Sequence, residues 1–316
     1  MVFYDFLVLI VSLAVLVFGA ELLVKGASNI AKHLGISDFV IGLTLVAIGT
    51  SLPELATSIA ASFSRDSGLI MGNIVGSNIA NIGLILGLAA LLYTIETKNK
   101  AFRKDSLFLF WISILFIIFA MNKEISFTEG LVFLLIFFFY LLHLFRSKEE
   151  KIIPYQKITR NKHMDKNFIK NLGITLIGIA GLYFGSKFLI PAAENLAITA
   201  NIGTEIIGLS LIAVGTSLPE LFVTISAARR HLEDIFIGNL IGSNITNILL
   251  VLGVSSLINP ISISNPILFL FIPVMMVLTL LFLIFIRSNF VYRILQGFSL
   301  LFFYLIFILL LIFARF

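Results

Sequence analysis

Long apolar stretches separated by short polar connections run through the whole sequence. A helix needs about 20 apolar residues to cross a bilayer, so each long stretch is a candidate membrane span. Ten stretches cover residues 2–24, 36–64, 69–93, 107–121, 126–145, 168–191, 203–228, 235–258, 266–286 and 294–314. The first is not expected to be a cleaved signal peptide, because Asp5 lies where such peptides are basic and no Lys or Arg precedes Lys25. The pattern predicts ten transmembrane helices.

Composition strengthens this prediction. Hydrophobic residues make up 59% of the 316 positions and charged residues 12%, whereas soluble domains carry about 25% charged residues. The chain lacks the charge to cover a water-facing surface, so we expect an all-α membrane protein with the lipid bilayer around it. The absence of Cys excludes disulfides, thiolate metal sites and Cys nucleophiles.

Basic residues mark one side of the predicted membrane protein. All but four of the 22 Lys and Arg residues lie in the connections after the odd-numbered stretches, and the exceptions are Arg65, Lys123, Lys187 and Arg315. Because cytoplasmic loops are rich in Lys and Arg, we expect a multi-pass cell-membrane protein with both termini extracellular and a cytoplasmic linker at 147–167. The charge of +5 follows this sidedness and forms no face for nucleic acid, and no obligate protein partner is evident.

An internal repeat divides the chain. A shift of 166 residues aligns positions 36–88 with 202–254 without a gap, and 26 of the 53 pairs are identical. The identities gather in GTSLPEL, which begins at Gly49 and Gly215, and in GN followed by GSN, which begins at Gly72 and Gly238. We expect a repeat unit of five helices, residues 1–146 and 168–316. Because five is odd, the second copy must cross the membrane upside down, as in alternating-access transporters with a site near the midplane.

The first repeated block predicts a broken helix that carries a carboxylate. Pro53 has no N–H, so the Gly49 carbonyl loses its intrahelical donor and the helix is expected to kink between Ala47 and Pro53. Thr50 and Ser51 supply hydroxyl groups beside it, and Glu54 supplies a charge that costs about 3 kcal/mol to insert near the bilayer centre. The second copy repeats Ala213, Thr216, Ser217, Pro219 and Glu220. No Lys or Arg lies centrally in any predicted span, so mobile cations are the expected counter-ions.

The second block adds a polar helix face. Asn73, Ser77 and Asn81 recur every four residues, which places them on one side of a helix. Asn239, Ser243 and Asn247 repeat the arrangement, and Gly72, Gly76, Gly238 and Gly242 are expected to let this helix approach the broken one. All of the offered ligands are oxygen atoms, which suit hard cations such as Ca²⁺ or Na⁺ better than Zn²⁺ or copper.

These motifs resemble the alpha repeats of the sodium/calcium exchangers, within the calcium/cation antiporter superfamily. GTSLPE followed by GN and GSN, present twice in a chain of ten predicted spans, carries the resemblance. It implies a prokaryotic-type exchanger without a regulatory domain, with two inverted halves and four ion positions at the midplane. It also implies ligand roles: Ca²⁺ is held by Glu54, Glu220 and the carbonyls of Thr50 and Thr216; Na⁺, or both ions in turn, by the carbonyls of Ala47 and Ala213 and by Ser51, Ser77, Ser217, Ser243, Asn81 and Asn247.

One position departs from the family pattern. Many relatives carry Asp where this chain has Asn247, and the potassium-dependent branch is associated with an acid there. With Asn at both Asn81 and Asn247, potassium dependence is less expected, and two carboxylates must serve every bound ion. The usual ratio of three Na⁺ to one Ca²⁺ is therefore implied by the resemblance and not by the residues.

The predicted function is secondary antiport of Na⁺ against Ca²⁺ by alternating access, with electrogenic Ca²⁺ export. The transported ions are the substrates, no prosthetic group is implied, and no catalytic constellation points to an enzyme. The long first and sixth helices are expected to slide across the other helices. A proton/calcium antiporter is the nearest alternative, because a buried Glu can carry H⁺, and a cation channel is a weaker one.

Outside the repeated blocks, Glu21 and Lys25 are four residues apart and are expected to form a local ion pair.

Overall fold

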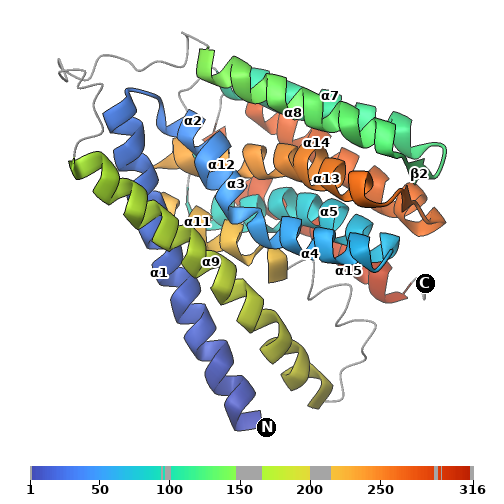
Figure 1. The fold of residues 1–316 in the computed structure, drawn as a ribbon, viewed down its shortest axis with the longest axis horizontal. Coiled ribbons are helices and arrows are strands. Elements are labelled where there is room, and N and C mark those ends of the chain that lie inside the picture. The colour runs from blue at the N-terminus through green and yellow to red at the C-terminus, as the bar shows by residue number, and fades with distance from the viewer. Residues whose placement is uncertain are drawn as a thin grey trace.

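The computed structural model describes residues 2–93, 95–96, 101–146, 166–199, 215–287, 291–292 and 294–313. These residues form helices joined by short turns, with two small strand pairs at the ends of helices (Figure 1). Most of the predicted linker and residues 200–214, which include Ala213 and part of the seventh predicted span, lie outside the described residues.

The first part of the chain, up to residue 146, runs through eight α-helices, two π-helical segments and two short strands. In chain order these are α1 (Val2–Leu34), α2 (Asp38–Ile41), η1 (Gly42–Val46), α3 (Ala47–Thr50), α4 (Leu52–Phe63), α5 (Ser67–Ile79), η2 (Ala80–Leu86), α6 (Gly87–Leu92), β1 (Ile95–Glu96), α7 (Ala101–Ala120), β2 (Glu124–Ile125) and α8 (Phe127–Arg146).

The described elements after residue 165 follow a similar order. They are α9 (Lys166–Thr199), α11 (Leu218–Arg229), α12 (Glu233–Thr246), η3 (Asn247–Val251), α13 (Leu252–Ile258), β3 (Ile261–Ser262), η4 (Ile267–Phe271), α14 (Ile272–Arg287), β4 (Val291–Tyr292) and α15 (Ile294–Phe313). Their bounds repeat those of the first part: α4 shifted by 166 residues is α11, and β1 shifted by 166 residues is β3.

Length and composition identify the membrane spans. Seven described helices are long and apolar enough to cross a bilayer, or eight if the bent pair Asp38–Thr50 and Leu52–Phe63 is one span. The chain is therefore a helical, multi-pass membrane protein. The count of ten spans and the inverted orientation of the halves stay predictions.

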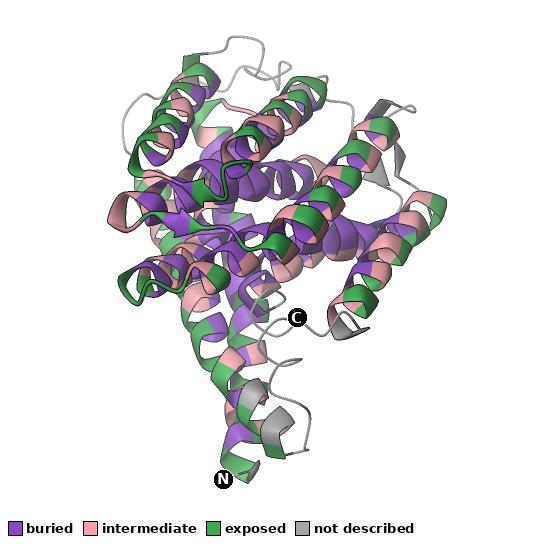
Figure 2. Cartoon of the chain, turned by 90° about the vertical axis from the view of Figure 1, so that its right-hand side faces the viewer, coloured by how far each residue is buried: buried purple, intermediate pink, exposed green. Residues whose placement is uncertain are grey.

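The two longest helices, α1 and α9, pack against each other in antiparallel fashion (Figure 1). A Cβ added to Gly178 would lie 2.5 Å from the Leu23 backbone nitrogen, and one added to Gly19 would lie 2.9 Å from that of Leu182. Only glycine allows two helix backbones to come this close. Figure 2 shows the N-terminal end of α1 extending beyond the other helices, with exposed residues along it. The pair is thus a unit with its own tight seam.

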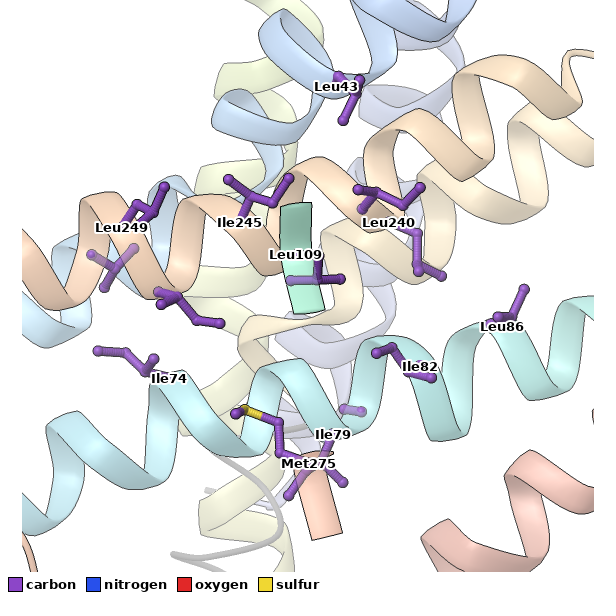
Figure 3. Packing of buried hydrophobic residues seen from close by; sticks show 14 of the residues in the cluster. Leu43, Ile74, Ile79, Ile82, Leu86, Leu109, Leu240, Ile245, Leu249 and Met275 are labelled. Atoms are coloured by element: carbon purple, nitrogen blue, oxygen red, sulfur yellow. The ribbon is translucent and has the colours of Figure 1, made fainter. Parts of the chain in front are cut away.

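Two helical runs form the buried centre of the remaining bundle. In α5–η2–α6, 83% of the apolar stretch is buried, and in α12–η3–α13 the share is 94%, against 33% for α1. Figure 3 shows their apolar side chains interleaving, with Ile74, Ile79 and Ile82 on one run and Leu240, Ile245 and Leu249 on the other. These runs carry the second repeated block, so the candidate ligands lie where water and lipid are excluded.

Contacts between the parts of the chain follow a reciprocal pattern. Strand β1 pairs with β4, and β2 pairs with β3, both antiparallel. In the numbering of the repeat, β3 corresponds to β1 and β4 to β2. The first strand of each copy therefore pairs with the second strand of the other copy. A reciprocal exchange of this kind is what a two-fold relation between similar units produces.

The glycines of the second block differ between the copies. A Cβ on Gly238 would lie 2.5 Å from the Phe39 carbonyl oxygen and 3.0 Å from the Leu43 nitrogen, whereas one on Gly72 would meet no atom of the described residues within 4 Å. Gly242 is equally tight, at 2.5 Å from the Leu43 carbonyl oxygen. The expectation of close approach is therefore confirmed for α12 against α2 and η1, whereas Gly72 shows no such approach to the described residues.

This difference predicts opposite effects of one methyl group. Gly238→Ala should lower the free energy of unfolding by about 1–3 kcal/mol, because the obstructing atoms are backbone and cannot turn aside. Gly72→Ala should leave stability unchanged or raise it by up to about 1 kcal/mol, since Ala is the better helix former. Thermal unfolding of both variants in detergent checks this, and equal Tm values for the two would contradict it.

Candidate functional site

The predicted break in the proline-bearing helix is confirmed. The chain bends by 43° between Asp38–Thr50 and Leu52–Phe63, and Ser51 at the bend has φ −82° and ψ 8°. Ser217 has nearly the same conformation, φ −83° and ψ 4°, at the start of α11. In both copies the proline occupies the first turn of the following helix, where its missing N–H costs no hydrogen bond. Each break therefore places a hydroxyl and a carboxylate beside an interrupted backbone.

The two carboxylates of the repeat are fully enclosed. Glu54 is 0% exposed and Glu220 is 1% exposed, and the two side chains are close enough to repel each other. Ser51 donates a hydrogen bond to Oε1 of Glu220 over 3.3 Å, and Ser77 donates to Oε1 of Glu54 over 3.4 Å. Among the described residues neither carboxylate has a Lys or Arg partner, so the negative charge is balanced by no side chain there.

Threonine and asparagine side chains join the two copies reciprocally. Thr50 donates to Oδ1 of Asn239, and Thr216 donates to Oδ1 of Asn73, each over 3.1 Å. Thr50 also lies 3.3 Å from the Ser243 hydroxyl, and Ser77 lies 3.3 Å from that of Thr216. The broken helix of each copy is therefore hydrogen-bonded to the polar helix face that carries the second repeated block of the other copy.

Four amides form a second reciprocal set. Asn81 donates to Oδ1 of Asn244 over 3.3 Å, and Asn247 donates to Oδ1 of Asn78 over 3.2 Å. All four side chains are at most 1% exposed. Asn78 and Asn244 belong to the repeated GSN triplet, but we selected only Ser and the later Asn as ligand candidates. The signal that could have found them is their identity in both copies at the predicted midplane.

Some buried oxygens at this site have no hydrogen-bond partner in the described part of the chain. They are the hydroxyl of Ser217 and four carboxylate or amide oxygens, namely Oε2 of Glu54, Oε2 of Glu220, Oδ1 of Asn81 and Oδ1 of Asn247. A buried acceptor without a partner costs about 1–3 kcal/mol, and more when it is charged. Four such oxygens, two of them on carboxylates, match the needs of a hard cation such as Na⁺ or Ca²⁺. Together they form a buried set of acceptors whose chemistry suits a hard cation.

The two copies are not identical in their bonding. Nδ2 of Asn73 donates to the Glu54 carbonyl over 3.0 Å and to the Ser58 hydroxyl over 2.9 Å. The corresponding Nδ2 of Asn239 has no partner in the described residues, and neither has the hydroxyl of Thr224, which corresponds to Ser58. The helix pair α4–α5 is thus closed by two hydrogen bonds that the pair α11–α12 lacks.

The predicted ligands that can be located fall into one buried cluster. Glu54, Glu220, Thr50, Thr216, Ser51, Ser77, Ser217, Ser243, Asn81 and Asn247 are each at most 2% exposed. The Ala47 carbonyl accepts bonds from the Thr50 hydroxyl over 3.2 Å and the Ser51 nitrogen over 3.0 Å. Ala213 lies outside the described residues.

The ion pair expected between Glu21 and Lys25 is wrong, because the Glu21 carboxylate lies 3.7 Å from Arg230.

Comparison with known proteins places this arrangement in a family. The family model described as sodium/calcium exchanger protein matches residues 4–146 and 170–313. The chain belongs to the sodium/calcium exchanger family. The sodium/calcium exchanger MaX1 of Methanosarcina acetivorans is 41% identical over 344 residues, covering 98% of both chains. The inner membrane protein YrbG of Escherichia coli is 33% identical over 262 residues, covering 80% of this chain and 79% of its own length.

A solved structure of the sodium–calcium exchanger NCX_Mj, soaked with 2.5 mM Na⁺ and 0.1 mM Ca²⁺, has the same fold. Its TM-score with this exchanger is 0.86, at 32% sequence identity, and the match covers 100% of both chains. Family and fold together identify a membrane transporter that exchanges cations with Ca²⁺, and not an enzyme. The expectation drawn from the GTSLPE and GSN motifs is confirmed at this level.

The unequal bonding of the two asparagines predicts unequal sensitivity to truncation. Asn73→Ala removes three hydrogen bonds and leaves the Glu54 carbonyl without this donor, so we expect a loss of about 1–3 kcal/mol in stability and at least a tenfold slower Ca²⁺ flux. In the described part of the chain, Asn239→Ala removes one hydrogen bond, that from Thr50. It should therefore be milder in both thermal unfolding and vesicle flux. The reverse order would contradict the asymmetry of the site.

Proposed function

We propose that the exchanger couples Na⁺ to Ca²⁺ at the buried cluster by alternating access. The observation that carries the proposal is the set of four buried oxygens without partners, on Glu54, Glu220, Asn81 and Asn247. The family and the likeness to the NCX_Mj structure support the same ions. Two carboxylates balance one divalent cation, so the site can be neutral with Ca²⁺ bound.

The ligands divide by charge and position. Ca²⁺ takes the two carboxylates and the backbone carbonyls of Thr50 and Thr216, which the breaks at Ser51 and Ser217 bring beside the acids. Na⁺ positions use the smaller neutral groups around them, some shared with Ca²⁺. These are the carbonyls of Ala47 and Ala213, the hydroxyls of Ser51, Ser77, Ser217 and Ser243, and the amides of Asn81 and Asn247.

Shared ligands make the exchange obligatory. Glu54 and Glu220 contribute to both ion sets, so full occupancy by Na⁺ withdraws the charge that holds Ca²⁺. Because the empty site leaves two like charges buried side by side, the ion-free form is the least stable state. Because the empty site is unstable, the protein changes from one side of the membrane to the other with ions bound. This favours antiport over return of the ion-free protein.

The coupling energy favours Ca²⁺ export. With three Na⁺ per Ca²⁺, a tenfold Na⁺ gradient supplies about 1.4 kcal/mol per ion, or about 4.2 kcal/mol in all. The single net charge moved adds about 2.3 kcal/mol per 100 mV. The ratio of three to one comes from the resemblance to the family, and an electrogenic cycle follows from it.

The fold supports a two-fold architecture for this cycle. Ten spans in two inverted halves, residues 1–146 and 168–316, would explain the 166-residue shift of the elements, the crossed strand pairs and the reciprocal asparagine bonds. In this arrangement the pair α1–α9 slides across the core to open the site to each side in turn. The basic connections then face the cytoplasm, the termini lie outside, and the protein is located in the cell membrane.

Reconstitution into liposomes tests the proposal. Ca²⁺ uptake into Na⁺-loaded vesicles should follow an outward Na⁺ gradient and should increase when the potential drives positive charge outward. Uptake driven only by a pH gradient would replace Na⁺ with H⁺ as the coupled ion. Calcium flux without any counter-ion would indicate a channel.

In the same assay Glu54→Gln and Glu220→Gln should each reduce exchange at least a hundredfold, because each halves the charge available to Ca²⁺. The control is Glu124→Gln, at an exposed position in β2, which should exchange like the unchanged protein. Full activity in both carboxylate variants would show that the ions bind elsewhere.

Replacement of the neutral amide at position 247 tests ion choice. Asn247→Asp adds a third carboxylate next to Asn78 and should make Ca²⁺ uptake depend on K⁺, raising it at least twofold when K⁺ is present. Asn122→Asp is the matched control, because its exposed side chain keeps the oxygen that accepts from the Glu124 nitrogen over 3.1 Å. Equal responses to K⁺ in both variants would exclude a selectivity role for Asn247.

A further inference from the structure

A second polar site lies between α1 and α9, away from the ion cluster. A cavity of about 490 Å³ opens where the C-terminal end of α1 meets the N-terminal end of α9; Figure 1 shows these two helix ends side by side. Its size lies within the range of small-molecule sites, about 300–1,000 Å³. Its lining includes Lys25, Lys32, Lys170, Asn29, Asn167 and Asn171.

The spacing along both helices directs these side chains to one place. Lys25, Asn29 and Lys32 are four and three residues apart on α1, and Asn167, Lys170 and Asn171 follow the same periodicity on α9, so each set shares one helix face. Asn29 donates to Oδ1 of Asn171 over 3.2 Å and joins the two faces. A Cβ on Gly26 would collide with the Thr175 hydroxyl, so the backbones touch next to the cavity. The Lys and Asn side chains therefore lie on two helices that are in direct contact.

The charge of the cavity is one-sided. None of the described residues that line it is acidic, while three are lysines. The nearest acidic neighbour on α1, Glu21, lies one turn from Lys25 but contacts Arg230 instead, at 3.7 Å. Asp38 acts electrostatically on Lys32, which leaves Lys25 and Lys170 without a carboxylate at ion-pair distance in the described residues. Two ammonium groups and several amide groups thus line the cavity with no carboxylate of the described residues at ion-pair distance from the lysines.

We propose that this cavity binds a phosphate-bearing anion, of the kind presented by an anionic phospholipid head group or by free phosphate. Lys ammonium groups bind phosphate as point charges, and the N-terminal end of α9 adds the positive end of a helix dipole. Basic pockets between membrane helices on the cytoplasmic side suit such head groups, and the sequence predicts this end to be cytoplasmic. A phosphate bound to both helices would join the ends of α1 and α9.

Binding to the purified full-length protein tests this without reference to transport. The probes are phosphatidylglycerol, phosphatidylcholine with the same acyl chains, and inorganic phosphate. Retained lipid is counted by native mass spectrometry, and phosphate binding is measured by calorimetry. Phosphatidylglycerol retained over phosphatidylcholine assigns the site to a lipid head group, and phosphate binding without lipid preference assigns it to a soluble anion.

The variant is Lys25→Gln/Lys170→Gln, with Lys32 kept because it also faces Asp38. The control is Arg146→Gln/Arg229→Gln, which removes the same charge from exposed positions outside the cavity. The cavity variant should weaken binding of the preferred probe at least tenfold, and the control should change it less than twofold. Equal losses in the two variants, or no binding of either anion by the unchanged protein, would overturn the proposal. Matching Tm values show that both variants fold.

Discussion

Glu54 and Glu220 are two carboxylates enclosed in a membrane protein with no cationic side chain beside them in the described residues. Burying a charge is costly unless it is paired, and no described side chain supplies the opposite charge here. Three features of the structure determine the surroundings of these carboxylates. They are the helix breaks at Ser51 and Ser217, the polar faces of α5 and α12, and the close helix packing around them. They surround the carboxylates with oxygen atoms, and the proposed role of the bound ions is to supply the positive charge that the described side chains do not.

The reciprocal bonds explain how one site is built from two distant segments. Asn81 with Asn244 and Asn247 with Asn78 close the centre in the same way from both copies. The bonds of Asn73 have no counterpart at Asn239, so similar sequences hold two different local arrangements at once. That inequality is what a transporter requires, because a perfectly symmetric site would face both sides of the membrane alike.

Local sequence rules predicted the parts of the site that depend on local chemistry. The break before Pro53 follows from a missing N–H, and the polar face of α5 follows from helical spacing; both are present. Contacts between helices that are far apart in the sequence could not be predicted from these local rules. The partner of Glu21 is Arg230 and not Lys25, since the position of α11 next to α1 cannot be obtained from spacing along one helix. Asn78 was overlooked because its role depends on Asn247 across the repeat.

The hydrogen bond between Thr50 and Asn239 joins residues 189 positions apart, and this has a consequence for biosynthesis. A ribosome delivers the first broken helix to the membrane long before the helix that completes it exists. Until α12 arrives to pack on α2 and η1, the polar groups of the first copy must rely on water or on other parts of the insertion machinery. The buried cluster can therefore form only after α12 has been made, and a chain truncated before α12 lacks the partners that Thr50 finds in Asn239 and Ser243.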